Sequence, residues 1–276
     1  MRSTTICCAL LAAACAHAPL SPSALDDVKA VAIVVRVADE AGPHATVFRD
    51  DVAWKPQLAP KKIEDAEADR RLVSAITNGT FEKDKDGARK LTAHTLTRFE
   101  LADTLRSQLL DLLPRSHPWA GSVNPADVAR ALESFLVHEV PAPPPDYHRL
   151  LELGVDTVVE IVIEDYGMHA DKGRAGLYLV GTARMFRIDG SELYHRKFFS
   201  DELTAGLEGL DPFAVARNAN LFAERLKNIV TAVAQQVAAD LTLGQPARAT
   251  PPPAGEDVKS PNRAKAPAAP AADDSL

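Results

Sequence analysis

Acidic side chains that share one predicted strand and its end are the first candidates for chemistry. Glu160 lies within a run of β-branched residues, and Glu164 and Asp165 follow that run directly. Two neighbouring carboxylates can divide the acid and base roles of a hydrolytic reaction between them. The alternative is an outward-facing Glu160, or a cross-strand ion pair of Glu160 with Arg184 or Arg196. That alternative is favoured, because charge pairs are common on the exposed face of a sheet.

The sequence predicts no catalytic, metal-binding or cofactor-binding residue. Its eight histidines include no pair at i, i+4 and no His-Glu-x-x-His frame, so a zinc site is not expected. Acidic residues alternate over positions 82–86 before Gly87, as at the start of a calcium loop, but Ala93 stands where that loop needs a bidentate Glu. A solvated loop is expected there. Glycine-rich phosphate motifs and the Gly-x-Ser-x-Gly elbow are absent from the sequence.

All three cysteines, at positions 7, 8 and 15, lie in the first fifteen residues. Arg2 precedes the apolar run 6–14, which is far shorter than the roughly 20 residues that span a bilayer, so the segment is predicted to be a targeting signal. Its end, L-L-A-A-A-C at positions 10–15, resembles the lipobox of bacterial lipoprotein precursors. The resemblance implies that residues 1–14 form a signal peptide and that Cys15 is lipidated and becomes the first residue.

The predicted lipid anchor also indicates where in the cell envelope the protein is located. Several acyl chains on Cys15 would give lasting membrane attachment, where a single chain gives only marginal binding. Ala16 stands where the inner-membrane retention signal of enteric bacteria would be Asp, so the resemblance implies the periplasmic face of the outer membrane. The alternative is cleavage by the ordinary signal peptidase at an Ala-x-Ala pattern ending at Ala16 or Ala18.

Periodicity predicts one α/β domain over residues 28–243, with a mixed sheet of about four to five strands packed by helices in an α/β sandwich. The predicted strands cover 30–37, 45–48, 157–163, 176–188 and 191–199. The predicted helices cover 61–77, 96–113, 124–137, 147–153 and a long region from 211 to 243. Within the helix 96–113, Phe99, Leu105 and Leu109 are expected on one buried stripe. Asp189-Gly190 predicts a hairpin turn, and Gly154 is expected to end a helix.

Low-complexity segments flank this domain. Residues 15–27 form a short spacer with two prolines. Residues 244–276 contain sixteen Ala or Pro among thirty-three residues, which predicts a disordered tail. The whole chain has 31 Lys+Arg against 38 Asp+Glu, a net charge of −7 without a basic stripe, so nucleic acid is not expected as a partner.

The stretch 150–160 (L-L-E-L-G-V-D-T-V-V-E), the Asp189-Gly190 turn and the segment 193–198 (L-Y-H-R-K-F) resemble a pattern of bacterial envelope lipoproteins. It is the domain shared by the TolB amino-terminal region and the curli-secretion lipoprotein, and the likeness covers residues 146–243. It implies a short helix, a strand, a hairpin and a closing helix, and it carries no catalytic residue. Residues 114–123 offer only a loop where that family has a second strand.

Two functions remain open from the sequence. The favoured one is a non-enzymatic interaction or assembly module of the periplasm, bound to the membrane through Cys15 and associated with envelope proteins of a transport or secretion complex. The alternative is a periplasmic hydrolase whose site residues converge only in the fold. An enzyme needs a concave site with convergent titratable groups, whereas a module needs an exposed apolar face or a free sheet edge. The oligomeric state is not predicted.

Overall fold

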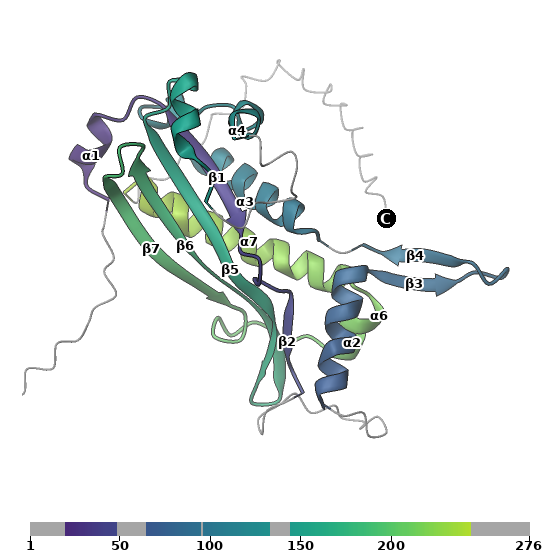
Figure 1. The fold of residues 1–276 in the computed structure, drawn as a ribbon. Helices are drawn as coiled ribbons and strands as arrows, with labels where there is room; N and C mark the ends of the chain where they lie inside the picture. Colours follow the sequence, from purple (N-terminus) through teal and green to yellow (C-terminus); the bar gives the residue numbers. More distant parts are fainter. Residues whose placement is uncertain (1–19, 49–64, 95, 133–143, 244–276) are drawn as a thin grey trace, which may run out of the picture.

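The computed structural model describes residues 20–48, 65–94, 96–132 and 144–243 (Figure 1). Cys15, the predicted signal peptide, residues 15–19 of the predicted spacer and the predicted tail lie outside the described residues, as do residues 133–137 of the predicted helix 124–137.

A five-stranded mixed sheet forms the centre of the molecule, which confirms the predicted α/β class. Its strands are β1 (Val31–Val37), β2 (His44–Thr46), β5 (Thr157–Asp171), β6 (Arg174–Arg187) and β7 (Glu192–Asp201). The order is β1-β5-β6-β7, and β2 pairs with the far end of β5. β1 and β2 run parallel to β5, while β6 and β7 are antiparallel to their neighbours. The predicted Asp189-Gly190 turn joins β6 to β7, with Gly190 at φ 96°.

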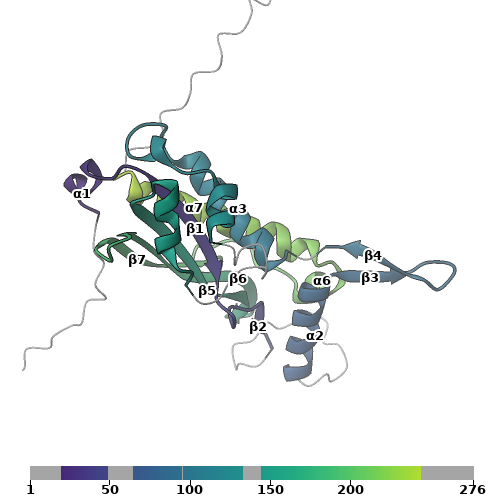
Figure 2. The same cartoon turned by 45° about the horizontal axis from the view of Figure 1, so that its top comes forward.

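Four helices of the described chain lie on one face of this sheet (Figures 1 and 2). The elements on that side are α2 (Asp65–Asn78), α3 (Arg98–Leu112), α6 (Pro212–Arg217) and α7 (Asn220–Leu241). The other face is covered at one end by α4 (Pro125–Ala131) and the 3₁₀ helix η2 (Tyr147–Leu153), which Gly154 ends at φ 73° as predicted. The remaining short helices are α1 (Pro22–Asp26) and η1 (Trp119–Gly121).

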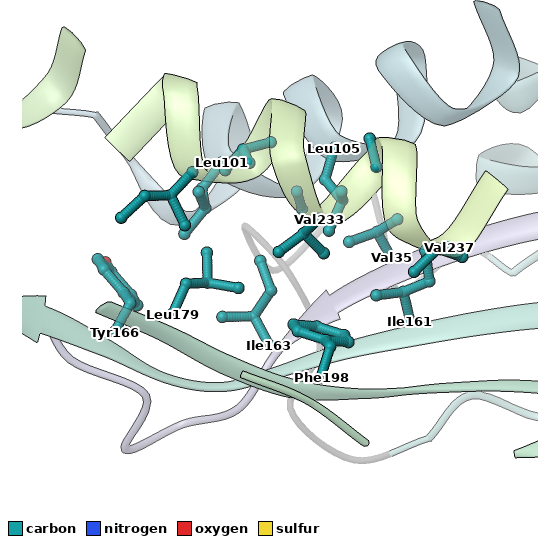
Figure 3. Packing of buried hydrophobic residues seen from close by; sticks show 14 of the residues in the cluster. Val35, Leu101, Leu105, Ile161, Ile163, Tyr166, Leu179, Phe198, Val233 and Val237 are labelled. Atoms are coloured by element: carbon teal, nitrogen blue, oxygen red, sulfur yellow. The ribbon is translucent and has the colours of Figure 1, made fainter. Parts of the chain in front are cut away.

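The main core lies between the sheet and the helices α3 and α7, which pack side by side (Figure 3). Leu101, Leu105, Val233 and Val237 of the two helices all face the sheet and are at most 1% exposed. β1 is buried along its whole length because its alternate residues enter two cores, the main one and a smaller one beneath α4 and η2. This two-sided burial explains why β1 is a continuous apolar run.

Three local expectations need correction. Phe99 is 46% exposed, because it lies about a third of a turn away from the centre of the buried face that Leu101, Leu105 and Leu109 define. The region from 211 to 243 forms two helices, α6 and α7, which are interrupted at Asn218. The loop expected around 82–87 is the turn of a hairpin formed by β3 (Thr80–Lys83) and β4 (Arg89–Ala93).

Candidate functional site

Glu160, the main acidic candidate, lies in a buried ionic cluster on the sheet face opposite α3 and α7. Its side chain is 0% exposed, which shows that the outward-facing alternative is wrong. It accepts hydrogen bonds from Arg36 Nε at 2.7 Å, from the Tyr147 hydroxyl at 2.6 Å and from Arg184. The expected pairing with Arg184 across β5 and β6 is therefore confirmed. Arg196 pairs instead with Asp240 near the end of α7.

The electrostatics of this cluster keep Glu160 ionised. Burial raises the pKa of Glu160, but hydrogen bonds from Arg184 and Tyr147 and the charge of Arg36 outweigh it and hold the pKa below its usual value. Burial, and then the neighbouring carboxylate, raise the pKa of Tyr147, so its phenol stays protonated and donates. A carboxylate held by three donors is a poor general base, and the cluster is best understood as the polar part of the smaller core.

Glu164 and Asp165 do not join Glu160 in a carboxylate pair. Thr182 Oγ1 donates to Glu164 at 3.1 Å, and the Tyr178 hydroxyl donates to Asp165 at 3.1 Å. Glu164 lies at a register shift in β5 between Ile163 and Asp165, and Glu160 lies about 13 Å up the strand from Glu164. No acid–base site of the kind considered from the sequence forms here.

His169, Asp201 and Thr204 lie together on the same face but do not form a nucleophile–base pair. His169 Nε2 lies 2.9 Å from Asp201 Oδ1, and Thr204 Oγ1 donates to Asp201 Oδ2 at 2.6 Å. Both groups therefore bind the carboxylate, and the histidine does not bind the hydroxyl that it would have to activate. Within the described parts of the chain, no group of three or more His, Cys, Asp or Glu side chains is arranged to hold a metal ion.

The acidic positions that resemble a calcium loop serve a turn instead. Asp84 Oδ1 accepts hydrogen bonds from the backbone N–H groups of Asp86 and Ala88, at 3.0 and 2.8 Å. Gly87 takes φ 79°, a conformation that suits glycine in a tight turn. The acidic alternation therefore shapes the tip of the β3–β4 hairpin.

This hairpin, residues 80–93, is named here the hairpin arm, and it projects from the body beyond the start of α7 (Figures 1 and 2). Phe81 and Leu91 are direct cross-strand partners and are 40% and 38% exposed. The Arg89 guanidinium lies 4.9 Å from the centre of the Phe81 ring. The arm therefore presents an apolar pair, flanked by charge, away from either core.

The base of the hairpin arm is fixed to the body. Ala219 N–H donates to Thr80 Oγ1 and His94 N–H donates to Asn220 Oδ1, each at 3.0 Å. Gly79, at φ 73°, lets the chain turn into the arm, and a Cβ there would lie 2.5 Å from the carbonyl oxygen of Ala93. The arm is thus held in a defined direction by both of its strands.

The sequence analysis missed this element, although a signal for it exists. Gly79 and Gly87 are separated by a short run that contains Phe81, and a second run with Leu91 follows. A glycine-containing turn between two short β-prone runs is typical of a hairpin. The charged residues between them favoured the interpretation as a loop.

The sheet also ends in a free strand. Among the described residues, β7 pairs with β6 on one side and with no strand on the other. Phe199 of β7 is 59% exposed, and Lys197, on the same face, is exposed too. An edge strand is a potential partner for another extended chain, and a lysine on it is a common protection against unwanted pairing.

Comparisons with known proteins identify no family. No family model matches the chain, and no curated protein matches it. Among solved structures, the chain is similar to the hypothetical protein CT253 from Chlamydia trachomatis, with 13% identity and a TM-score of 0.25 over 78% of this chain and 99% of that one. No helix in the described residues is long and apolar enough to cross a membrane.

Proposed function

We propose that this protein is a non-enzymatic interaction module of the bacterial envelope, and that the hairpin arm is its contact element. The observation that carries the proposal is the exposed pair of Phe81 and Leu91 on an arm that lies outside both hydrophobic cores.

A two-stranded hairpin by itself is at best marginally stable in water, because it buries too little apolar surface. The arm carries its two large apolar side chains on the surface and is stabilised by its hydrogen-bonded base. The arm adds no buried side chains to either hydrophobic core, and exposed apolar side chains of this kind mark a surface that a partner covers. The free edge of β7 offers a second contact site of the kind that extended chains use.

The membrane part of the proposal depends on the signal at the N-terminus. Lipidation of Cys15 would tether the body to the periplasmic face of the outer membrane, where the arm reaches neighbouring envelope proteins of a transport or secretion complex. The likeness of residues 146–243 to the TolB amino-terminal and curli-secretion lipoprotein domain favours the same setting. No specific observation favours the alternative of a periplasmic hydrolase, since no hydrogen bond among the described residues joins a histidine to a Ser or Thr hydroxyl.

Site-specific photo-crosslinking in intact cells tests this proposal. A photoreactive residue is placed at position 81 or at position 91 of the full-length chain. The matched control carries it at Arg130, whose side chain is 73% exposed on α4, away from the arm. We expect one adduct of discrete mass from both arm positions and none from position 130. Equal crosslinking from all three positions, or none from the arm, would contradict the proposal.

A further inference from the structure

An open cleft of about 760 Å³ lies on the helix-covered side of the sheet, at the carboxyl end of β1. Its walls are the loop that follows β1, the second half of α2 and the start of α3, and Tyr166 of β5 also lines it. In open α/β sheets, ligands commonly bind beyond the carboxyl ends of parallel strands, near a helix N-terminus. Position alone does not make a binding site, so the evidence for a ligand must come from the side chains that line the cleft.

Tyr166 is the first of these side chains. It is 2% exposed, and it extends from the sheet toward the helices (Figure 3). Its hydroxyl has no hydrogen-bond partner in the described parts of the chain, although it lines the cleft. Burial raises the pKa of Tyr166 to about 12, against the opposing charge of Arg98. At neutral pH the phenol is thus a protonated donor, and its hydroxyl is available to a ligand in the cleft.

Arg98 supplies the positive charge of the cleft. One nitrogen of its guanidinium donates to the carbonyl oxygen of Asp39, and its other donors have no partner in the described chain. That bond holds the Arg98 side chain against the loop that follows β1, and the remaining guanidinium N–H groups stay available to a ligand. Two unused donor groups, one of them cationic, fit a planar acceptor such as a carboxylate.

The other side chains narrow the class of ligand. Asp39 and Glu40 also line the cleft, and their negative charges disfavour a multiply charged anion such as phosphate. His44 Nε2 is already bonded to the carbonyl oxygen of Glu40 at 2.8 Å. Val73 and Leu96 supply apolar walls for the body of the ligand. We propose that this cleft binds a small monocarboxylate, whose carboxylate accepts hydrogen bonds from Arg98 and Tyr166 and whose apolar body lies against Val73 and Leu96.

Titration of the full-length chain in detergent, followed by the NMR amide signals of the cleft, tests this site. The probes are butyrate, its neutral isostere butyramide, and inorganic phosphate. We expect butyrate to shift the signals of Val73, Thr77 and Leu96 saturably, with a dissociation constant in about the millimolar range. Butyramide should bind at least about tenfold more weakly, because it carries no negative charge. Phosphate should also bind at least about tenfold more weakly, because it is multiply charged and the cleft contains acidic side chains.

Substitutions assign the donors. Arg98→Met should weaken butyrate binding about tenfold or more, and Tyr166→Phe about three- to tenfold. Arg130→Met on α4 is the matched control and should leave binding unchanged. Equal affinity for butyrate and butyramide, tighter binding of phosphate, or no saturable shift in the wild-type chain would overturn the proposal. The probe comparison uses the wild-type chain, so it remains decisive even if a variant fails to fold.

Discussion

At the residue scale, the most consequential side chain is Glu160. It carries a full charge at 0% exposure, and three donors from three separate elements hold it: Arg36 of β1, Tyr147 of η2 and Arg184 of β6. A buried ion pair contributes little net stability when complete, but it leaves an uncompensated charge when one partner is removed. Glu160 therefore joins the smaller core to the sheet, which is a structural role.

Replacing Glu160 by Gln should destabilise the protein by about 3–5 kcal/mol, because it removes the negative charge that pairs with Arg36 and Arg184 in a buried cluster. Asp127→Asn is the control, since Asp127 pairs with Arg130 on the exposed surface of α4 and should cost at most about 1 kcal/mol. Urea unfolding at neutral pH measures both. A change for Glu160→Gln as small as that of the control would show that the cluster does not stabilise the fold.

The pKa of Glu160 also predicts how stability depends on pH. Because the folded state holds this pKa below its usual value, its contribution is fully present above the unfolded pKa and is lost as the pH falls through the folded value. The free energy of unfolding of the wild-type chain should therefore drop more steeply between about pH 5 and pH 3 than that of Glu160→Gln. Parallel pH profiles for the two proteins would contradict this assignment.

Gly154 is a second residue with a defined physical task. It ends η2 at φ 73°, and no heavy atom beyond its chain neighbours lies within 4 Å of an added Cβ, so the cost of a side chain is purely conformational. Gly154→Ala should destabilise by about 1–2 kcal/mol, and Gly154→Asn by less, because Asn tolerates this conformation. Equal losses for the two variants in thermal unfolding would indicate a steric cause instead.

At the element scale, the parts that share a periodic apolar pattern were predictable from the sequence. β1, α3 and α7 each bury a regular set of side chains, so their type and approximate bounds follow from spacing. The hairpin arm buries almost nothing, and its charged residues are typical of loops, so no periodic signal marks it. The burial of Glu160 could not be predicted from the sequence either, because its partner Arg36 lies 124 positions away in the chain and Tyr147 lies on another element.

Truncation of an apolar side chain should change global stability little in the hairpin arm and strongly in the core. Phe81→Ala removes an exposed side chain and should change global stability by less than about 1 kcal/mol, yet abolish crosslinking from position 91. Leu105→Ala, in the core between α3 and the sheet, should cost about 2–5 kcal/mol. Denaturant unfolding followed by circular dichroism measures the change in stability for both variants. If Phe81→Ala unfolds the chain as strongly as Leu105→Ala, the arm belongs to the core.

At the scale of the whole molecule, one α/β body is predicted to lie between a lipid anchor and an Ala/Pro-rich tail. Limited proteolysis should trim the residues beyond 244 first, because that composition cannot bury enough apolar surface to order the chain. The helix α7 should resist, since its apolar residues from Phe222 to Leu241 pack into the main core. Early cleavage inside α7 would be incompatible with the fold, and electrophoresis with mass analysis of the fragments distinguishes the two outcomes.

Membrane anchoring is the claim on which the proposed function depends, because it places the hairpin arm among envelope proteins. Metabolic labelling with a palmitate analogue tests it most directly, in cells that produce either the wild-type chain or the Cys15→Ser variant. The expected result is label on the wild-type protein and none on Cys15→Ser. Label that persists in the Cys15→Ser variant, or a wild-type protein that takes up none, would contradict the claim that this chain is a lipoprotein.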